Sequence, residues 1–92
     1  MNEDGFDLDA RRRRIRYRAW HRGLRELELL MGRFIDQHGA TLDERDVSEF
    51  ERLLDAQDQH VLAWLMGQSE PDTDCDTPTF KRLRAFGQTM AR

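Results

Sequence analysis

The sequence contains little of what usually stabilises a small protein. Cys75 is the only cysteine among 92 residues, so the chain has no partner for an internal disulfide and no CxxC pair. A single small domain of this length therefore relies on well-packed helices rather than on covalent links. Such cysteine usage is typical of a reducing compartment, and we expect a bacterial cytoplasm.

Long hydrophobic runs are also missing. No stretch approaches the roughly 20 apolar residues that cross a bilayer, and we expect no membrane insertion. The first residues lack the apolar core of a secretory signal. A cleaved transit peptide is not expected either, because transit peptides are poor in acidic residues, whereas the first ten residues include Glu3, Asp4, Asp7 and Asp9.

Lysine is nearly absent, and the arginines are unevenly distributed. Lys81 is the only lysine, eight arginines lie between Arg11 and Arg25, and the segment 70–76 is acidic. The run Arg11–Arg18 has two possible interpretations, a solvated helical face or an anion-binding patch. The net charge of -3 argues against general nucleic-acid binding, so no nucleic-acid partner is expected.

The first half of the chain predicts two helices. The first spans Ala10–Arg22 with Asp9 as its N-cap, and Gly23 either ends it in a left-handed conformation or allows a partner backbone to approach. The second spans Leu24–Gln37, because its apolar residues recur with a period of 3.6. Its predicted inner stripe is Leu24, Leu27, Leu30, Met31, Phe34, Ile35 and His38, with His38 as a C-terminal capping residue.

The second half predicts three more helices. Thr41 and Glu44 have the spacing of a capping box that begins a third helix, ending near Ala56. Asp58 is the expected N-cap of a short fourth helix that Gly67 ends. The pair Thr77–Pro78 has the signature of a helix start, with proline in the first turn.

No alternation of apolar and polar residues predicts a strand. We therefore predict an all-α fold, a small bundle of about five short helices in one domain over residues 1–92. Residues 1–8 are expected to be a flexible N-terminus and 68–76 an acidic, mobile loop. A monomer is expected.

No catalytic, metal or nucleotide site is predicted. The three histidines are scattered along the sequence, and Cys75 lies in a loop without a nearby histidine. Asp72, Asp74 and Asp76 alternate as in a calcium loop, but the central glycine and the final glutamate of that motif are missing. Neither GxGxxG nor GxxxxGK occurs.

One polar surface is the candidate functional site. Spacings of four, three and four place Arg22, Glu26, Leu29 and Arg33 on one side of the second helix. Leu29 is then surrounded by charged residues, including Arg25. It is either an ordinary exposed leucine or the centre of a small protein interface.

The segment Arg14–Glu26 resembles the signature of the succinate dehydrogenase assembly factor family, the flavinylation factors. Their hallmark, Arg-Gly-x-x-Glu, is matched by Arg22, Gly23 and Glu26. The resemblance continues through Leu29-Leu30-Met31, Leu53-Leu54 and the segment Asp58–Leu65. It departs at His21, where many members have a basic residue, and at Gln57-Asp58-Gln59, where many have Asp-Pro or Asp-Asp. These departures affect the wider contact surface and leave the three motif residues unchanged.

This resemblance implies a small helical bundle that binds the flavoprotein subunit of succinate dehydrogenase, and possibly of fumarate reductase. Such a protein promotes covalent FAD attachment to that subunit. It is not an enzyme, and the FAD belongs to the partner. The resemblance places Arg22, Gly23 and Glu26 at the contact. The alternatives are a generic, antitoxin-like interaction module and a small nucleic-acid-binding domain. The residues expected to bind the partner are Arg22, Gly23, Arg25, Glu26, Leu29 and Asp58.

Overall fold

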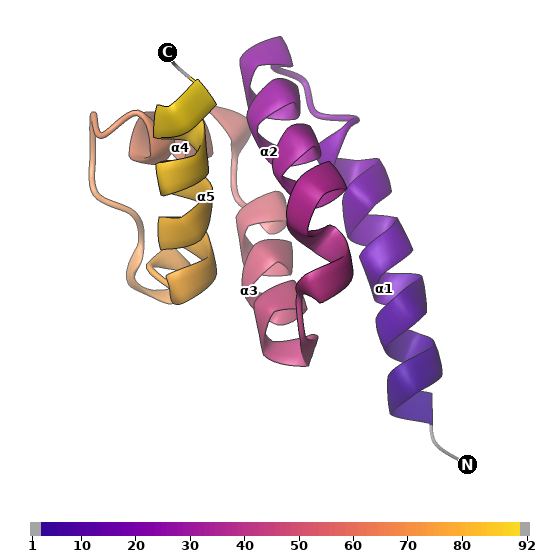
Figure 1. Ribbon diagram of the computed structural model, residues 1–92. Coiled ribbons are helices and arrows are strands. Elements are labelled where there is room, and N and C mark those ends of the chain that lie inside the picture. The colour runs from indigo at the N-terminus through magenta and orange to yellow at the C-terminus, as the bar shows by residue number, and fades with distance from the viewer. Residues whose placement is uncertain (1–2, 91–92) are drawn as a thin grey trace.

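The computed structural model describes residues 3–90, with side chains from Asp7 onward. Within this range the chain forms helices and turns and no strand, which confirms the predicted all-α class (Figure 1). Two 3₁₀ turns, η1 (Gly39–Thr41) and η2 (Thr73–Cys75), lie in the connections. The α-helices are α1 (Glu3–Ala19), α2 (Arg25–His38), α3 (Glu44–Asp55), α4 (Asp58–Leu65) and α5 (Pro78–Met90).

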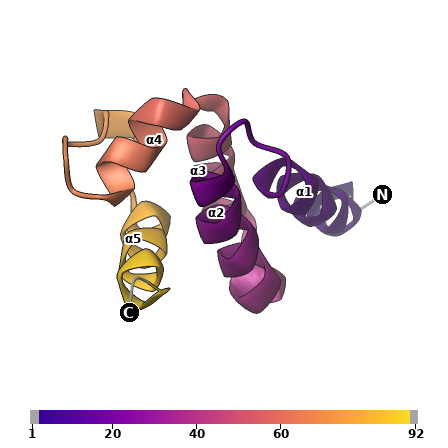
Figure 2. The ribbon, with the colours of Figure 1, turned by 90° about the horizontal axis from the view of Figure 1, so that it is seen from above.

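The helices α2 and α3 form the centre of the bundle. Helix α1 packs against both of them from one side and α5 packs against both from the other, as Figures 1 and 2 show. The short α4 contacts α2 and α5 at one end of the bundle. Among residues 3–90, no helix is both long and apolar enough to cross a membrane.

The core forms where the apolar stripes of these helices meet. On α2, the predicted residues Leu27, Met31, Phe34 and Ile35 are buried. Phe34 stacks on Phe50 of α3 at a ring-centroid distance of 6.1 Å and meets Phe86 of α5 edge-on at 5.6 Å. Such aromatic pairs add packing energy beyond the area that they bury, so this cluster links three helices at the centre of the fold.

Two predicted helix ends are confirmed. Gly67 follows α4 with φ +75°, and its N–H donates to Trp64 O while Gln68 N–H donates to Ala63 O at 2.9 Å. This pair of bonds is the Schellman arrangement, which favours glycine because the left-handed conformation has no steric cost there. At the start of α5, Thr77 Oγ1 accepts from Phe80 N–H at 3.1 Å, with Pro78 as the first helical residue.

The predicted starts of two helices are wrong. Helix α1 begins at Glu3, so residues 3–8, expected to be a flexible N-terminus, form its first turns, and Asp9 is an internal residue 3.4 Å from Arg12. Residues 1 and 2 lie outside the described range. Helix α3 begins two residues later than predicted: Asp43 is its N-cap, in a capping box with Asp46. This capping bond from Asp46 N–H lowers the pKa of the Asp43 carboxyl.

His38 packs against aromatic rings instead of capping α2. Its ring lies 5.2 Å from that of Phe34 and 5.9 Å from that of Phe86. Its carbonyl accepts a hydrogen bond from Thr41 Oγ1 at 2.8 Å, so Thr41 stabilises the α2–α3 connection rather than the start of α3. The acidic segment 68–76 connects α4 to α5 and contains the turn η2.

The Trp20 side chain packs directly against Gly32 of α2, a residue that sequence analysis did not single out. The indole lies on Gly32 in the middle of α2, so closely that a Cβ at Gly32 would stand 2.4 Å from two ring carbons. Trp20 Nε1 donates to Asp36 Oδ1 at 3.3 Å. Gly32 therefore makes room for the residue that leads from α1 into the next connection.

We predict that Gly32→Ala destabilises the protein by about 1–3 kcal/mol, because the indole ring must move. An alanine inside a helix would otherwise stabilise it by about 1 kcal/mol over glycine, so the sign of the change is diagnostic. Urea unfolding followed by circular dichroism measures it. Gly23→Ala is the control, since a Cβ there would lie 3.5 Å from its nearest neighbour. Equal stability of Gly32→Ala and wild type would contradict the packing described here.

Candidate functional site

Arg22 holds the connection between α1 and α2 against the rest of the fold. Its side chain is only 10% exposed and forms an ion pair with Asp58. Nη1 donates to Leu54 O at 3.0 Å and Nη2 lies 3.4 Å from Ala56 O. The carbonyls of the last helical turn have no partner within their own helix, so Arg22 satisfies the end of α3. Its Nε is buried without a hydrogen-bond partner among the described residues.

Asp58 completes this arrangement from the first turn of α4. One carboxylate oxygen pairs with Arg22 and the other accepts from Gly23 N–H at 2.9 Å. The prediction that Asp58 is the N-cap of α4 is wrong, because Gln57 occupies that position and makes no side-chain cap bond. Asp58 is the first helical residue, where the helix dipole favours a negative charge. We call Arg22, Asp58 and the Gly23 N–H the Arg22–Asp58 clamp.

Gly23 is exposed beside the clamp and lines an open hollow with Leu24, Gln57, Asp58 and Gln59. The prediction that it ends the first helix in a left-handed conformation is wrong: α1 already ends at Ala19, and Gly67 is the only described glycine with a positive φ. A Cβ at Gly23 would make an ordinary contact. The other interpretation of Gly23, an approach of a partner backbone, stays a prediction.

The structure separates the six predicted contact residues into two groups. Gly23, Arg25 and Glu26 are exposed, and Leu29 is half-buried. Arg22 and Asp58 are instead joined to each other within the chain. The predicted common face is therefore wrong for Arg22, because it precedes α2, which begins at Arg25, and its side chain turns inward. Glu26, Leu29 and Arg33 remain on α2 at the predicted spacing.

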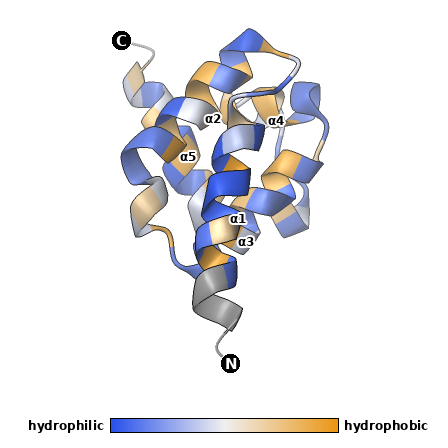
Figure 3. Cartoon of the chain, turned by 90° about the vertical axis from the view of Figure 1, so that its right-hand side faces the viewer, coloured by the Kyte–Doolittle hydropathy of each residue, from blue (hydrophilic) through white to orange (hydrophobic). Residues whose placement is uncertain are grey.

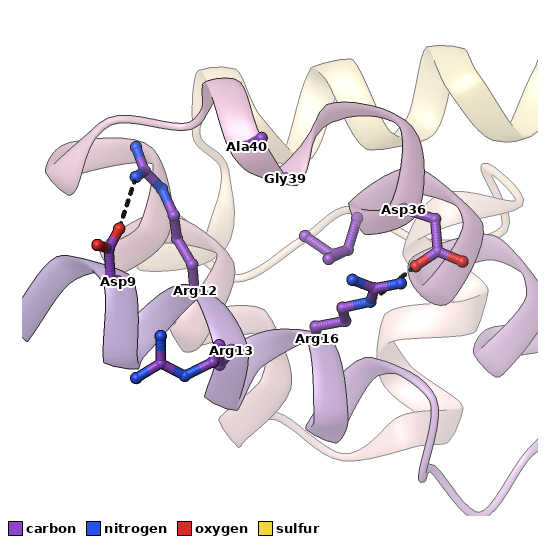
Figure 4. Close-up of a pocket in the computed structure, with 8 residues that line it drawn as sticks. Asp9, Arg12, Arg13, Arg16, Asp36, Gly39 and Ala40 are labelled. Carbon is purple, nitrogen blue, oxygen red and sulfur yellow. Dashed lines mark hydrogen bonds and ion pairs between the residues drawn. The ribbon is translucent and has the colours of Figure 1, made fainter.

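The arginine run on α1 mainly attaches this helix to its neighbours. Arg11 donates to Ser48 and Glu51 at 2.8 Å each, and the bond to Glu51 raises the pKa of Arg11. Arg18 pairs with Asp55 at 2.8 Å. Arg16 reaches Asp36 of α2 at 3.1 Å, as Figure 4 shows.

Arg12 donates to Leu42 O. Four arginines of the run therefore bind other parts of the same chain: Arg11, Arg12, Arg16 and Arg18. Neither sequence interpretation, a solvated face or an anion-binding patch, predicted this.

Neither the single cysteine nor the acidic and histidine side chains form a reactive or metal-binding site among the described residues. Cys75 is buried, and this burial, with the nearby Asp74 and Asp72, raises the pKa of its thiol. The thiol therefore remains protonated near neutral pH and is a weak nucleophile. In the described part of the chain, no three His, Cys, Asp or Glu side chains gather as a metal site would need.

The fold and the clamp together define a small all-α protein that holds one exposed loop in a set position. Residues 13–87 match a protein family described as "Flavinator of succinate dehydrogenase". This chain belongs to that family, as the resemblance predicted. The matched range includes the whole clamp.

Curated proteins similar to this chain are named as assembly factors. The chain is 32% identical over 77 residues to the FAD assembly factor SdhE of Acetobacter pasteurianus, covering 84% of this chain and 71% of that one. It is 35% identical over 66 residues to the FAD assembly factor SdhE of Pseudomonas aeruginosa, covering 70% and 77%. It is also 28% identical over 89 residues to succinate dehydrogenase assembly factor 2, mitochondrial, of Aspergillus terreus, covering 92% and 30%. The family is thus one of assembly factors rather than enzymes.

We predict that breaking the clamp destabilises the fold far more than breaking a surface pair between α1 and α3. Arg22→Ala should cost about 2–4 kcal/mol, because it leaves Asp58 and two carbonyls without their donor. Arg22→Lys should not restore the loss, since an ammonium cannot reproduce the guanidinium fork. The measurement is a double-mutant cycle of Arg22→Ala with Asp58→Ala in urea unfolding.

The matched control is the cycle of Arg18→Ala with Asp55→Ala. This pair is 35% and 71% exposed, so its coupling should stay below about 1 kcal/mol. Equal coupling energies in the two cycles would show that the Arg22–Asp58 pair contributes no more than a surface contact.

Proposed function

We propose that this chain is an assembly factor that binds the flavoprotein subunit of succinate dehydrogenase and promotes covalent attachment of FAD to it. Membership of the family and the names of its curated relatives support this function. The structural observation that carries it is the exposed loop held by the Arg22–Asp58 clamp. The proposal includes a bacterial cytoplasmic location, action as a monomer, and no FAD held by the chain itself.

In this proposal some of the predicted contact residues position the loop and others contact the partner. Arg22 and Asp58 position the loop, and Gly23, Arg25 and Glu26 contact the flavoprotein. Gly23 adds no side chain beside the open hollow, so a partner backbone can come close. The exposed carboxylate of Glu26 and guanidinium of Arg25 can form charge-assisted hydrogen bonds with it. Leu29, one turn further along α2, offers an apolar surface at the edge of this contact.

The chain acts by shape rather than by proton transfer. The covalent bond forms between FAD and a histidine of the flavoprotein, and the chemistry belongs to those two groups. By binding one conformation of the flavoprotein, this chain would raise the fraction in which the flavin and the histidine are in reacting geometry. A loop that is already held on two sides suits this role, because it loses little conformational freedom when it binds.

A reconstitution tests the function directly. Apo-flavoprotein and FAD are incubated with and without this protein, and covalent flavin is followed by its fluorescence in denaturing gels. We expect faster and more complete attachment with the protein present, because the reactive conformation becomes more populated. Bovine serum albumin at the same concentration is the control. The same flavin signal in all three reactions would rule out the proposed activity.

Variants of the exposed residues test the contact. We predict that Gly23→Arg and Glu26→Ala each weaken flavoprotein binding roughly tenfold or more, as contact residues at the centre of an interface do. Both should unfold at the wild-type temperature, since both positions are exposed. Titration calorimetry gives the dissociation constants.

Glu70→Ala, which removes one negative charge from an exposed site in the acidic segment, is the matched control for Glu26→Ala. Loss of helical circular dichroism in Glu26→Ala would assign this residue to the fold instead. A pull-down that returns nucleic acid, or an unrelated protein and no flavoprotein, would favour one of the two alternative functions.

A further inference from the structure

A second surface lies next to the clamped loop, on the outer side of α1. Tyr17 is 64% exposed there and is one of two large hydrophobic side chains among the described residues that face the solvent to this degree. Its ring stacks on that of His21, with 4.0 Å between centroids and 18° between planes. His21 Nδ1 lies 2.7 Å from Tyr17 O, so this nitrogen carries the proton and donates it. The stack is thus held in place by the chain itself.

Two arginines flank this stack. Arg13 and Arg14 are exposed and lie four and three residues before Tyr17, so all three share one side of the helix. Among the described residues neither makes an ion pair, in contrast to Arg11, Arg16 and Arg18. Figure 4 draws Arg13 beside Arg12 and Arg16 at one hollow, with no interaction drawn to its guanidinium, and Figure 3 shows the mostly hydrophilic face that α1 presents.

Apart from the Tyr17–His21 stack, these exposed residues make no ion pair among the described residues, and they have the properties of a binding surface. Tyrosine and arginine are enriched among the residues that contribute most to protein interfaces. The stack on His21 restricts the tyrosine ring before any partner arrives, so less conformational freedom is lost on binding. The positive charges select a partner surface of opposite sign and accelerate the encounter with it.

We propose that Arg13, Arg14, Tyr17 and His21, the α1 face, form a second docking surface that binds an acidic patch of the flavoprotein. This inference rests on the proposed function. The α1 face leads along the chain directly into the clamped loop, since His21 is only two residues before Gly23 and both are exposed. The acidic patch would border the segment of the partner that contacts Gly23.

The test compares matched variants in titration against the apo-flavoprotein at low and at physiological salt. Tyr17→Ala should weaken binding roughly tenfold, whereas Tyr17→Phe, which keeps the stacked ring, should stay near wild type. Arg13→Gln with Arg14→Gln should weaken binding roughly tenfold at low salt and less at high salt, because salt screens exposed charges.

The control is Arg52→Gln with Lys81→Gln, which removes the same charge from exposed positions on α3 and α5. It should bind like wild type. Thermal unfolding is expected to be unchanged in every variant, because all substituted side chains are exposed. If both double variants weaken binding equally, only net charge matters and the α1 face is not a docking surface.

The outcomes separate this inference from the function on which it rests. Suppose that the wild type binds and that Gly23→Arg weakens binding, but that Tyr17→Ala and the Arg13 and Arg14 double variant do not. This result overturns the α1 face as a docking surface and leaves the proposed function intact. No binding by the wild type overturns both. Binding of a short DNA duplex that the double variant abolishes, with flavoprotein binding unaffected, assigns the face to nucleic acid and overturns this inference.

Discussion

The ion pair between Arg22 and Asp58 is the contact on which the candidate site depends. It joins the α1–α2 connection to the first turn of α4, a segment distant in the sequence, and Arg22 also binds the end of α3 through Leu54 O. Removing one partner of a largely buried pair leaves an uncompensated charge, which is far more costly than losing a pair in water. The same carboxylate also fixes the backbone at Gly23. The position of the exposed loop therefore follows from an interaction beneath it.

This arrangement explains how a short motif can carry two physical roles. In Arg-Gly-x-x-Glu, the arginine lies inside the molecule and the glycine and glutamate lie outside. The spacing of a continuous helix would have placed Arg22 and Glu26 on one side. The chain is extended at Leu24, with φ -119° and ψ 122°, and this break turns Arg22 towards Asp58 while Glu26 remains exposed on α2.

The arginines of α1 divide in the same way. Those facing α2 and α3 make ion pairs that attach a helix with few apolar residues to the bundle, where Ile15 and Ala19 are its fully buried contacts. Arg13 and Arg14 make no ion pair with another described residue, although Arg13 lines the same hollow as Arg12 and Arg16. The paired arginines of the basic run thus stabilise the fold, and the two without an ion pair belong to the proposed docking surface.

The sequence by itself determined the fold class, the family and the core face of α2, because helical periodicity and the caps at Gly67 and Thr77 are local signals. It also placed four of the six predicted contact residues within one motif, Arg22 to Glu26. Only the tertiary structure decided which of them face inward. The capping box starts at Asp43 rather than Thr41 because nearby residues compete for the N-cap position. The clamp role of Asp58 and the contact of Trp20 with Gly32 depend on neighbours that are remote in the sequence. A pattern along one chain segment carries no information about the segment packed against it, and that segment determines whether a charged side chain binds a partner or holds the fold.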